Sequence, residues 1–207
     1  MIFYLELKCL NLPQILSPDY SENPSLFSED CSGKLEIAPK QTILRKILLL
    51  SDTHSHIDDT ILKYVNLADE VWHAGDIGDL SVTDTIKKLK PLRAVFGNID
   101  DDKARMEFPL HNRFMCEGVS VWITHIGGYP GKYNPNIKDE MFTNPPKLFI
   151  CGHSHILKVM FDKKHDFLHM NPGAAGISGF HQIRTMLRFE INGEKITNLE
   201  IVELGKR

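Results

Sequence analysis

From residue 44 onward, short apolar runs alternate with amphipathic segments. Lys46–Leu50 ends in four consecutive apolar residues, which is typical of a central strand covered on both faces. Asp58 or Asp59 can then cap a helix whose apolar residues lie on one side. The next elements are expected at 70–73 (strand), 82–89 (helix) and 92–96 (strand). This alternation predicts βαβ units and a mostly parallel first sheet.

The second half of the chain is richer in predicted strands. They are expected at 119–124, 148–151, 157–161, 166–169, 182–190 and 196–202. Asn192-Gly193 separates the last two and is a strong signal for a tight hairpin turn. The order of elements predicts the α/β class, as an αββα sandwich of two facing mixed sheets with flanking helices.

Residues 1–43 lack such a pattern. The stretch 17–25 is polar and turn-forming, and no periodicity runs through 28–41. We predict a poorly ordered N-terminal extension over 1–43, or upstream sequence included by a misplaced start, followed by one domain over 44–207. A partner-binding arm is the functional alternative for the extension.

The overall composition is that of an ordinary globular protein, with 207 residues, 42% hydrophobic and 25% charged. A net charge of -3 gives no reason to expect stable binding to nucleic acid. No apolar stretch approaches the roughly 20 residues that cross a bilayer, and no signal peptide is evident. The four cysteines show no close pairing and are interpreted as reduced structural thiols, which favours a cytoplasmic location.

Side chains with metal-binding chemistry follow five predicted strands at their carboxyl ends, the edge at which open α/β sheets bind ligands. They are Asp52, His54, Asp76, Asn98, His125, His153 and His155. Successive clusters are 22 to 28 residues apart, about one strand–helix unit each. Asp-x-His and His-x-His place two side chains on one side of an extended segment. Imidazole and carboxylate ligands suit Zn, Mn or Fe, and Asp76 can bridge two such ions.

These motifs together resemble those of the calcineurin-like metallophosphoesterase superfamily, over about residues 45–203. The motifs are Asp52-x-His54, Gly75-Asp76, Gly97-Asn98-x-Asp100, Thr124-His125 and Gly152-His153-Ser154-His155. The short chain, with Asn171-Pro172-Gly173 after the histidine pair, is similar to the small single-domain phosphodiesterase branch.

The resemblance implies a two-metal-dependent phosphoesterase, with a phosphodiesterase favoured over a phosphomonoesterase. It assigns Asp52, His54, Asp76 and His155 to one metal, and Asp76, Asn98, His125 and His153 to the other. A hydroxide bridging the ions would attack phosphorus in line with the leaving group while Asn98 stabilises the developing charge. The expected cofactors are two divalent ions, Mn first, with Fe, Zn or Ni as alternatives.

Two departures from the larger phosphatases of that superfamily concern the leaving group. Their Gly-Asn-His-Glu motif is replaced here by Gly97-Asn98-Ile99-Asp100, and His125 is followed by Ile126 rather than by Gly-His. Both changes remove an imidazole beside the substrate, which suits activated diesters. We predict that His56 and Asp100 contact the substrate; a solvated loop histidine and a structural loop carboxylate are the alternatives.

Other polar residues have weaker signals. Residues 127–133 are interpreted as a mobile loop, in which Tyr129, Lys132 or Tyr133 could contact a phosphate or a base. His73 is interpreted as a core or supporting residue, and Asp79 as a helix cap or an orienting carboxylate. Four histidines without partner spacing are interpreted as surface or loop residues: His111, His165, His169 and His181.

Three functional classes remain open from the sequence. The leading one is an enzyme acting on a small phosphodiester or nucleotide-like substrate. The second is a metal-binding interaction scaffold of the retromer-subunit type, although all seven ligand positions hold competent residues. A nuclease acting on polynucleotides is disfavoured because no basic stripe appears. By analogy with relatives, a homo-oligomer is expected, without a membrane or a stable nucleic-acid partner.

Overall fold

The computed structural model describes residues 27–29, 35–37 and 43–207, and the chain separates into two units, 1–41 and 42–207. In the first unit, β1 (Phe27–Glu29) and β2 (Leu35–Ile37) pair antiparallel, which the sequence did not predict. The other residues up to 42 lie outside the described residues, and with them Cys9 and Cys31.

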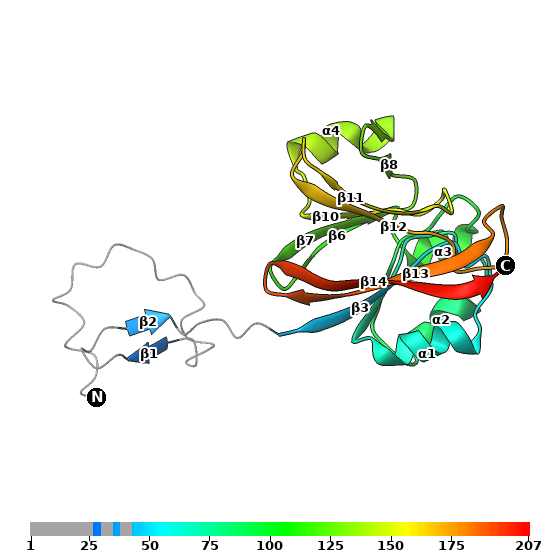
Figure 1. Ribbon diagram of the computed structural model, residues 1–207, viewed down its shortest axis with the longest axis horizontal. Coiled ribbons are helices and arrows are strands. Elements are labelled where there is room, and N and C mark those ends of the chain that lie inside the picture. The colour runs from blue at the N-terminus through cyan, green and yellow to red at the C-terminus, as the bar shows by residue number, and fades with distance from the viewer. Residues whose placement is uncertain (1–26, 30–34, 38–42) are drawn as a thin grey trace. The chain divides into compact units, whose positions relative to one another are not determined.

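The second unit contains two five-stranded sheets. The first has, in spatial order, β14 (Lys195–Lys206), β13 (Ile183–Asn192), β3 (Arg45–Leu50), β4 (Glu70–His73) and β5 (Leu92–Ala94). Strands β3, β4 and β5 are parallel, whereas β13 and β14 run antiparallel. Two helices lie on the outer side of this sheet, α1 (Asp59–Leu67) and α2 (Ser81–Lys87) (Figure 1).

The second sheet is also mixed. Its strands, in spatial order, are β11 (Leu157–Asp162), β12 (Phe167–Pro172), β10 (Leu148–Ile150), β7 (Val119–Thr124) and β6 (His111–Cys116). The remaining elements are α3 (Asp102–Glu107), α4 (Pro135–Thr143) and a small hairpin of β8 (Gly128–Tyr129) and β9 (Lys132–Tyr133). Figure 1 shows α4 on the outer side of this sheet, so the predicted αββα sandwich is confirmed.

The position of β3 explains its uninterrupted apolar sequence. Ile47 and Leu49 pack between the two sheets, in one cluster with Trp72 and with residues of β7, β10 and β13. Leu48 and Leu50 belong to the cluster beneath α1 and α2. All four side chains are at most 1% exposed, and burial of each stabilises the fold by about 1.5–3 kcal/mol. A strand covered on both faces needs apolar residues at every position.

Local signals placed most elements correctly. Asp58 caps α1 by accepting a hydrogen bond from the backbone N–H of Ile61, and Asn192 lies opposite Lys195 across the predicted hairpin turn. The sequence missed β6, α3 and α4. Within the predicted loop 127–133, residues 128–133 form the β8–β9 hairpin. In the part of the chain that the structure describes, no helix has the length and apolar character needed to cross a membrane.

Candidate metal centre

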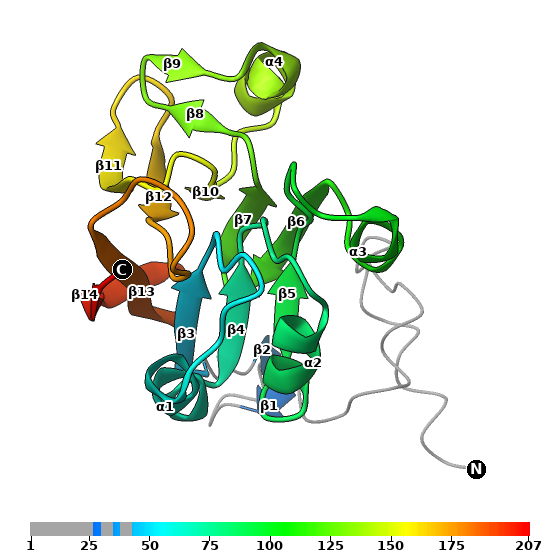
Figure 2. The ribbon, with the colours of Figure 1, turned by 90° about the vertical axis from the view of Figure 1, so that its right-hand side faces the viewer.

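The predicted ligands gather where several strands end. In Figure 2 the arrowheads of β3, β4 and β5 point toward one edge, at which the loops after these strands meet the loops after β7 and β10. Two groups of three ligand atoms form there, each with mutual separations within 4.8 Å. The first group is Asp52, His54 and His155, and the second is Asp76, His125 and His153.

The first group is centred on a buried carboxylate. Asp52 Oδ1 has no hydrogen-bond partner, although its side chain is fully buried. His155 Nε2 lies 3.3 Å from this oxygen and 3.3 Å from His54 Nε2. A buried carboxylate oxygen without a donor is costly, and two imidazole nitrogens pointing at one another cannot both donate usefully. A cation among these three atoms resolves both problems, so the residues fit a metal ion.

The second group has a fixed imidazole orientation. His125 Nδ1 lies 2.8 Å from the carbonyl oxygen of Ala74, which can only accept, so this nitrogen carries the proton. Nε2 of His125 therefore presents its lone pair toward Asp76 Oδ1 and Asn98 Oδ1, each 3.1 Å away. Three acceptors converging on one point fit a cation. Asn98, the seventh predicted ligand, thus lies beside the second group.

Asp76 joins the two groups. Its Oδ1 faces His125, while its Oδ2 lies 3.7 Å from His54 Nε2 in the first group. The carboxylate is 2% exposed and also accepts a hydrogen bond from the backbone N–H of Ile99 through Oδ1. A carboxylate with one oxygen toward each group has the orientation required of a bridging ligand.

The pKa shifts of His125 and Asp76 show that the second group stabilises a positive charge. Burial alone would lower the pKa of His125, but the hydrogen bond to Asp76 and the charges of Asp52 and Asp76 outweigh it and raise that pKa. Burial would raise the pKa of Asp76, but His125 reverses this effect and lowers it. A proton on His125 Nε2 satisfies the same acceptors that a metal ion would satisfy.

The backbone at the centre is strained. Five of the seven predicted ligands have positive φ angles: Asp52 (54°), His54 (47°), Asp76 (54°), His153 (68°) and His155 (55°). Non-glycine residues rarely adopt this region, and such strain concentrates at functional sites. Gly97 is required for a different reason, because a Cβ there would lie 2.1 Å from Asp76 Oδ1. The strand-end loops therefore bring their ligands together at a conformational cost.

His155 is oriented by a second histidine, which was interpreted from the sequence as a surface or loop residue and lies buried in a loop. His181 is 8% exposed, and its Nε2 donates to the carbonyl oxygen of Gly176 at 3.0 Å. Its Nδ1 is then an acceptor, 3.2 Å from His155 Nδ1. His155 consequently carries its proton on Nδ1 and directs the Nε2 lone pair into the first group. The sequence contains no spacing pattern that predicts the contact between His155 and His181.

Two buried polar residues hold the loops that carry the aspartates. His73 accepts from the Gly75 N–H through Nδ1 and donates through Nε2 to Thr53 Oγ1, at 3.1 and 2.9 Å. The Thr53 hydroxyl in turn donates to the carbonyl oxygen of Ile77 at 3.0 Å. This arrangement ties the loop after β3 to the loop after β4. The prediction of a core or supporting role for His73 is confirmed.

Asp100 and His56, predicted as substrate contacts, are both engaged elsewhere. The Asp100 carboxylate, 3% exposed, accepts from the backbone N–H groups of Gly78 at 2.8 Å and Gly97 at 2.7 Å. His56 Nε2 lies 3.1 Å from Asp58 Oδ2, which also receives a hydrogen bond from Arg184. This geometry favours the structural alternative for Asp100, because both carboxylate oxygens already have donors.

Other polar positions have structural roles. Asp79 accepts from the Ser81 N–H at the start of α2, and Asn171 donates to the carbonyl oxygen of Gly152, supporting the histidine loop as predicted. His169 is 1% exposed, so its interpretation as a surface or loop residue was wrong. Within the described residues, the two cysteines are free and buried, as predicted: burial raises the pKa of Cys116 to about 11 and of Cys151 to about 12.

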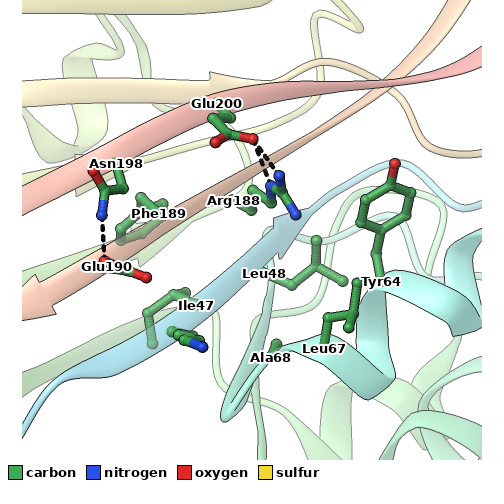
Figure 3. A pocket seen from close by; sticks show the side chains of 11 residues that line it. Ile47, Leu48, Tyr64, Leu67, Ala68, Arg188, Phe189, Glu190, Asn198 and Glu200 are labelled. Carbon is green, nitrogen blue, oxygen red and sulfur yellow. Dashed lines mark hydrogen bonds and ion pairs between the residues drawn. The ribbon is translucent and has the colours of Figure 1, made fainter.

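A hollow of about 290 Å³ lies away from these groups, between α1 and strands β3, β13 and β14 (Figure 3). Tyr64 and Leu67 form part of its wall, and Arg188 pairs with Glu200 beside it. None of the predicted ligands lines this hollow, so it adds nothing to the chemistry of the metal centre.

Comparison with protein families agrees with the geometry. Residues 46–194 match the calcineurin-like phosphoesterase superfamily domain. The chain belongs to this superfamily. The superfamily is metal-dependent, and the two ligand groups described above are the candidate metal sites here. A search of curated proteins finds no match.

Several solved structures share the fold. Vps29 from Entamoeba histolytica, crystallised in complex with Zn²⁺, aligns with a TM-score of 0.61 at 15% identity, over 76% of this chain and 98% of that one. An archaeal phosphodiesterase aligns with a TM-score of 0.58 at 21% identity, over 77% and 99%. A predicted phosphoesterase from Streptococcus pneumoniae aligns with a TM-score of 0.56 at 21% identity, over 78% and 90%.

Proposed function

We propose that this protein is a two-metal-dependent phosphodiesterase. The observation that carries the proposal is the Asp76 carboxylate, which directs one oxygen toward each of the two ligand groups. Asp52, His54, Asp76 and His155 would hold one ion, and Asp76, Asn98, His125 and His153 the other. Two divalent ions, with Mn(II) first, would supply Lewis acidity and a nucleophilic hydroxide near neutral pH.

The protein residues differ in their access to substrate. Asp52 and Asp76 are buried, whereas Asn98 and His153 are exposed. A phosphate group would therefore approach from the side of Asn98 and His153. With its Oδ1 turned toward the second group, the Asn98 amide nitrogen is available to donate to a phosphoryl oxygen and to stabilise charge in the transition state.

The missing acid favours substrates with weakly basic leaving groups. The carboxylate of Asp100 is occupied by two backbone N–H groups, and its neighbour Ile99 has no proton to give. In the reaction, a water oxygen forms a bond to phosphorus, the bond from phosphorus to the leaving oxygen breaks, and the water proton passes to solvent. Diesters with weakly basic leaving groups complete this step without a protein acid. The archaeal phosphodiesterase of the same fold supports the assignment.

The test compares hydrolysis of bis-p-nitrophenyl phosphate with that of p-nitrophenyl phosphate. Chelator-stripped protein is assayed alone and after addition of Mn(II), beside His153→Ala under the same conditions. We expect Mn(II) to restore cleavage of the diester, with a rate well above that of the monoester, and His153→Ala to lose it.

Two other outcomes count against the proposal. Equal rates on the two esters would contradict the diester preference. No turnover with Mn, Ni, Zn or Fe, in protein that binds two ions per chain, would favour the interaction scaffold instead.

A further inference from the structure

Two hollows flank the second ligand group. One, of about 260 Å³, is bordered by Asn98 and His125. The other, of about 470 Å³, is bordered by His153. Ile126 and Asn134 line both, so these two residues form the partition between them. A phosphodiester carries two organic groups on one phosphorus atom, and the arrangement offers a separate space for each.

The larger hollow has the size and lining of a small-molecule site. Cavities that bind small molecules usually measure about 300–1,000 Å³ and have mainly apolar walls with a few polar groups. Here the walls include Ile126, Tyr129 and Ile156, and two lysines, Lys132 and Lys158, are among the residues that line it. Among the described residues around this hollow there is no carboxylate. The lining therefore suits an organic group attached to an anionic phosphate.

An aromatic surface and a cation lie together in this wall. Lys158 Nζ is 4.1 Å from the centre of the Tyr129 ring, within the range of a cation–π contact. Tyr129 is 43% exposed even in this position, so part of the side chain stays available to a ligand. Stacking of a base on an aromatic side chain tolerates any base, because every base has a π face.

The wall is held in place by hydrogen bonds to neighbouring segments. His169 Nε2 donates to the carbonyl oxygen of Gly128 at 3.0 Å, and Tyr133 donates to Asp162 Oδ2 at 2.6 Å. The Asn134 amide donates to the carbonyl oxygen of Ile126 at 3.1 Å. These contacts fix both strands of the β8–β9 hairpin against the second sheet. A site that is formed before binding loses less entropy when the ligand enters.

We propose that the larger hollow binds the nucleoside of a nucleotide half of the diester substrate, with the base against Tyr129 and Lys158. The inference rests on the proposed function, since His153 connects the hollow to the site of phosphoryl chemistry. It assigns Tyr129 and Lys158 to substrate specificity, and it places the second substituent beyond Ile126 in the smaller hollow.

The test is a binding experiment that does not depend on turnover. Calorimetric titration of the Mn(II)-loaded protein with AMP and with inorganic phosphate gives a ratio of two dissociation constants, which isolates the contribution of the nucleoside. We expect AMP to bind about tenfold or more tightly than phosphate. Tyr129→Ala should remove most of this difference while leaving phosphate binding unchanged. Tyr64→Ala, in the remote hollow of Figure 3, is the matched control and should behave as wild type.

Kinetics provide the second measurement. Tyr129→Ala and Lys158→Ala should raise KM for p-nitrophenyl thymidine 5′-phosphate with little change in kcat, and should affect methyl p-nitrophenyl phosphate less. AMP and phosphate binding equally well to wild type, or AMP binding unaltered in Tyr129→Ala, would overturn the inference. Either result together with active hydrolysis of bis-p-nitrophenyl phosphate would leave the phosphodiesterase proposal intact.

Discussion

The imidazole rings of His155 and His181 face each other through their Nδ1 atoms, which lie 3.2 Å apart. Because Gly176 accepts from the other nitrogen of His181, the proton between the rings belongs to His155. The pair thereby selects the tautomer of His155 that presents Nε2 to Asp52 and His54. His181 is not a predicted metal ligand, but it orients His155, which is one.

His181→Ala should weaken metal binding at the first group. Loss of a partner that orients a ligating histidine typically costs 10- to 100-fold in metal affinity, and we expect an increase of about that size in the Kd for one of the two ions. Titration of chelator-stripped protein with Mn(II) measures both constants. His181→Asn keeps an acceptor and should recover part of the affinity. Two unchanged constants in His181→Ala would show that His155 is oriented by other contacts.

Asp76→Ala should affect both ions, whereas His54→Ala should affect one. The reason is that Asp76 faces both ligand groups and His54 belongs to the first. Elemental analysis after dialysis against limiting Mn(II) should give about one ion per chain for His54→Ala and fewer for Asp76→Ala. If Asp76→Ala retained a full ion at the second group, the bridging role would be wrong.

The substitution Asp100→Asn distinguishes a structural role of the Asp100 carboxylate from contact with the substrate. The amide keeps one acceptor oxygen but turns an N–H₂ group toward one of the two backbone N–H groups, which leaves a buried donor unsatisfied. We expect a loss of about 1–3 kcal/mol in the free energy of unfolding by urea. Asp139→Asn, at an exposed position on α4, is the control and should be near neutral. A normal unfolding curve with a raised KM would instead identify Asp100 as a substrate contact.

His73 makes stability depend on pH. Burial lowers its pKa from 6.5 to about 4 in the folded protein, so between these values only the unfolded chain binds a proton. Stability is therefore full above pH 6.5 and falls as the pH decreases toward 4, by up to about 1.4 kcal/mol per pH unit from this residue. Urea unfolding of chelator-stripped protein at pH 7 and pH 5 should show a smaller difference in His73→Gln than in wild type. An equal difference would mean that His73 does not titrate in this range.

Several features follow from local sequence because their causes are local. The apolar run of β3, the Asp58 cap of α1 and the Asn192-Gly193 turn each depend on residues close in the chain. Helix α4 was missed because its buried apolar positions are only Ile137 and Met141, too few to establish a helical period. The short strands β8 and β9 form through pairing across Pro130 and Gly131, for which no alternating pattern exists.

For the site, the sequence alone determined the ligand types and their order, since each follows a strand whose direction is set by the βαβ pattern. Only the tertiary structure decided which oxygen of Asp76 faces which group, and that Asp100 binds two backbone N–H groups. It also revealed His181 behind His155 and two hollows divided by Ile126. Apart from the contact between Asp100 and Gly97, these relations join segments that are 20 or more residues apart and are set by packing of the two sheets, so no periodicity in the chain encodes them.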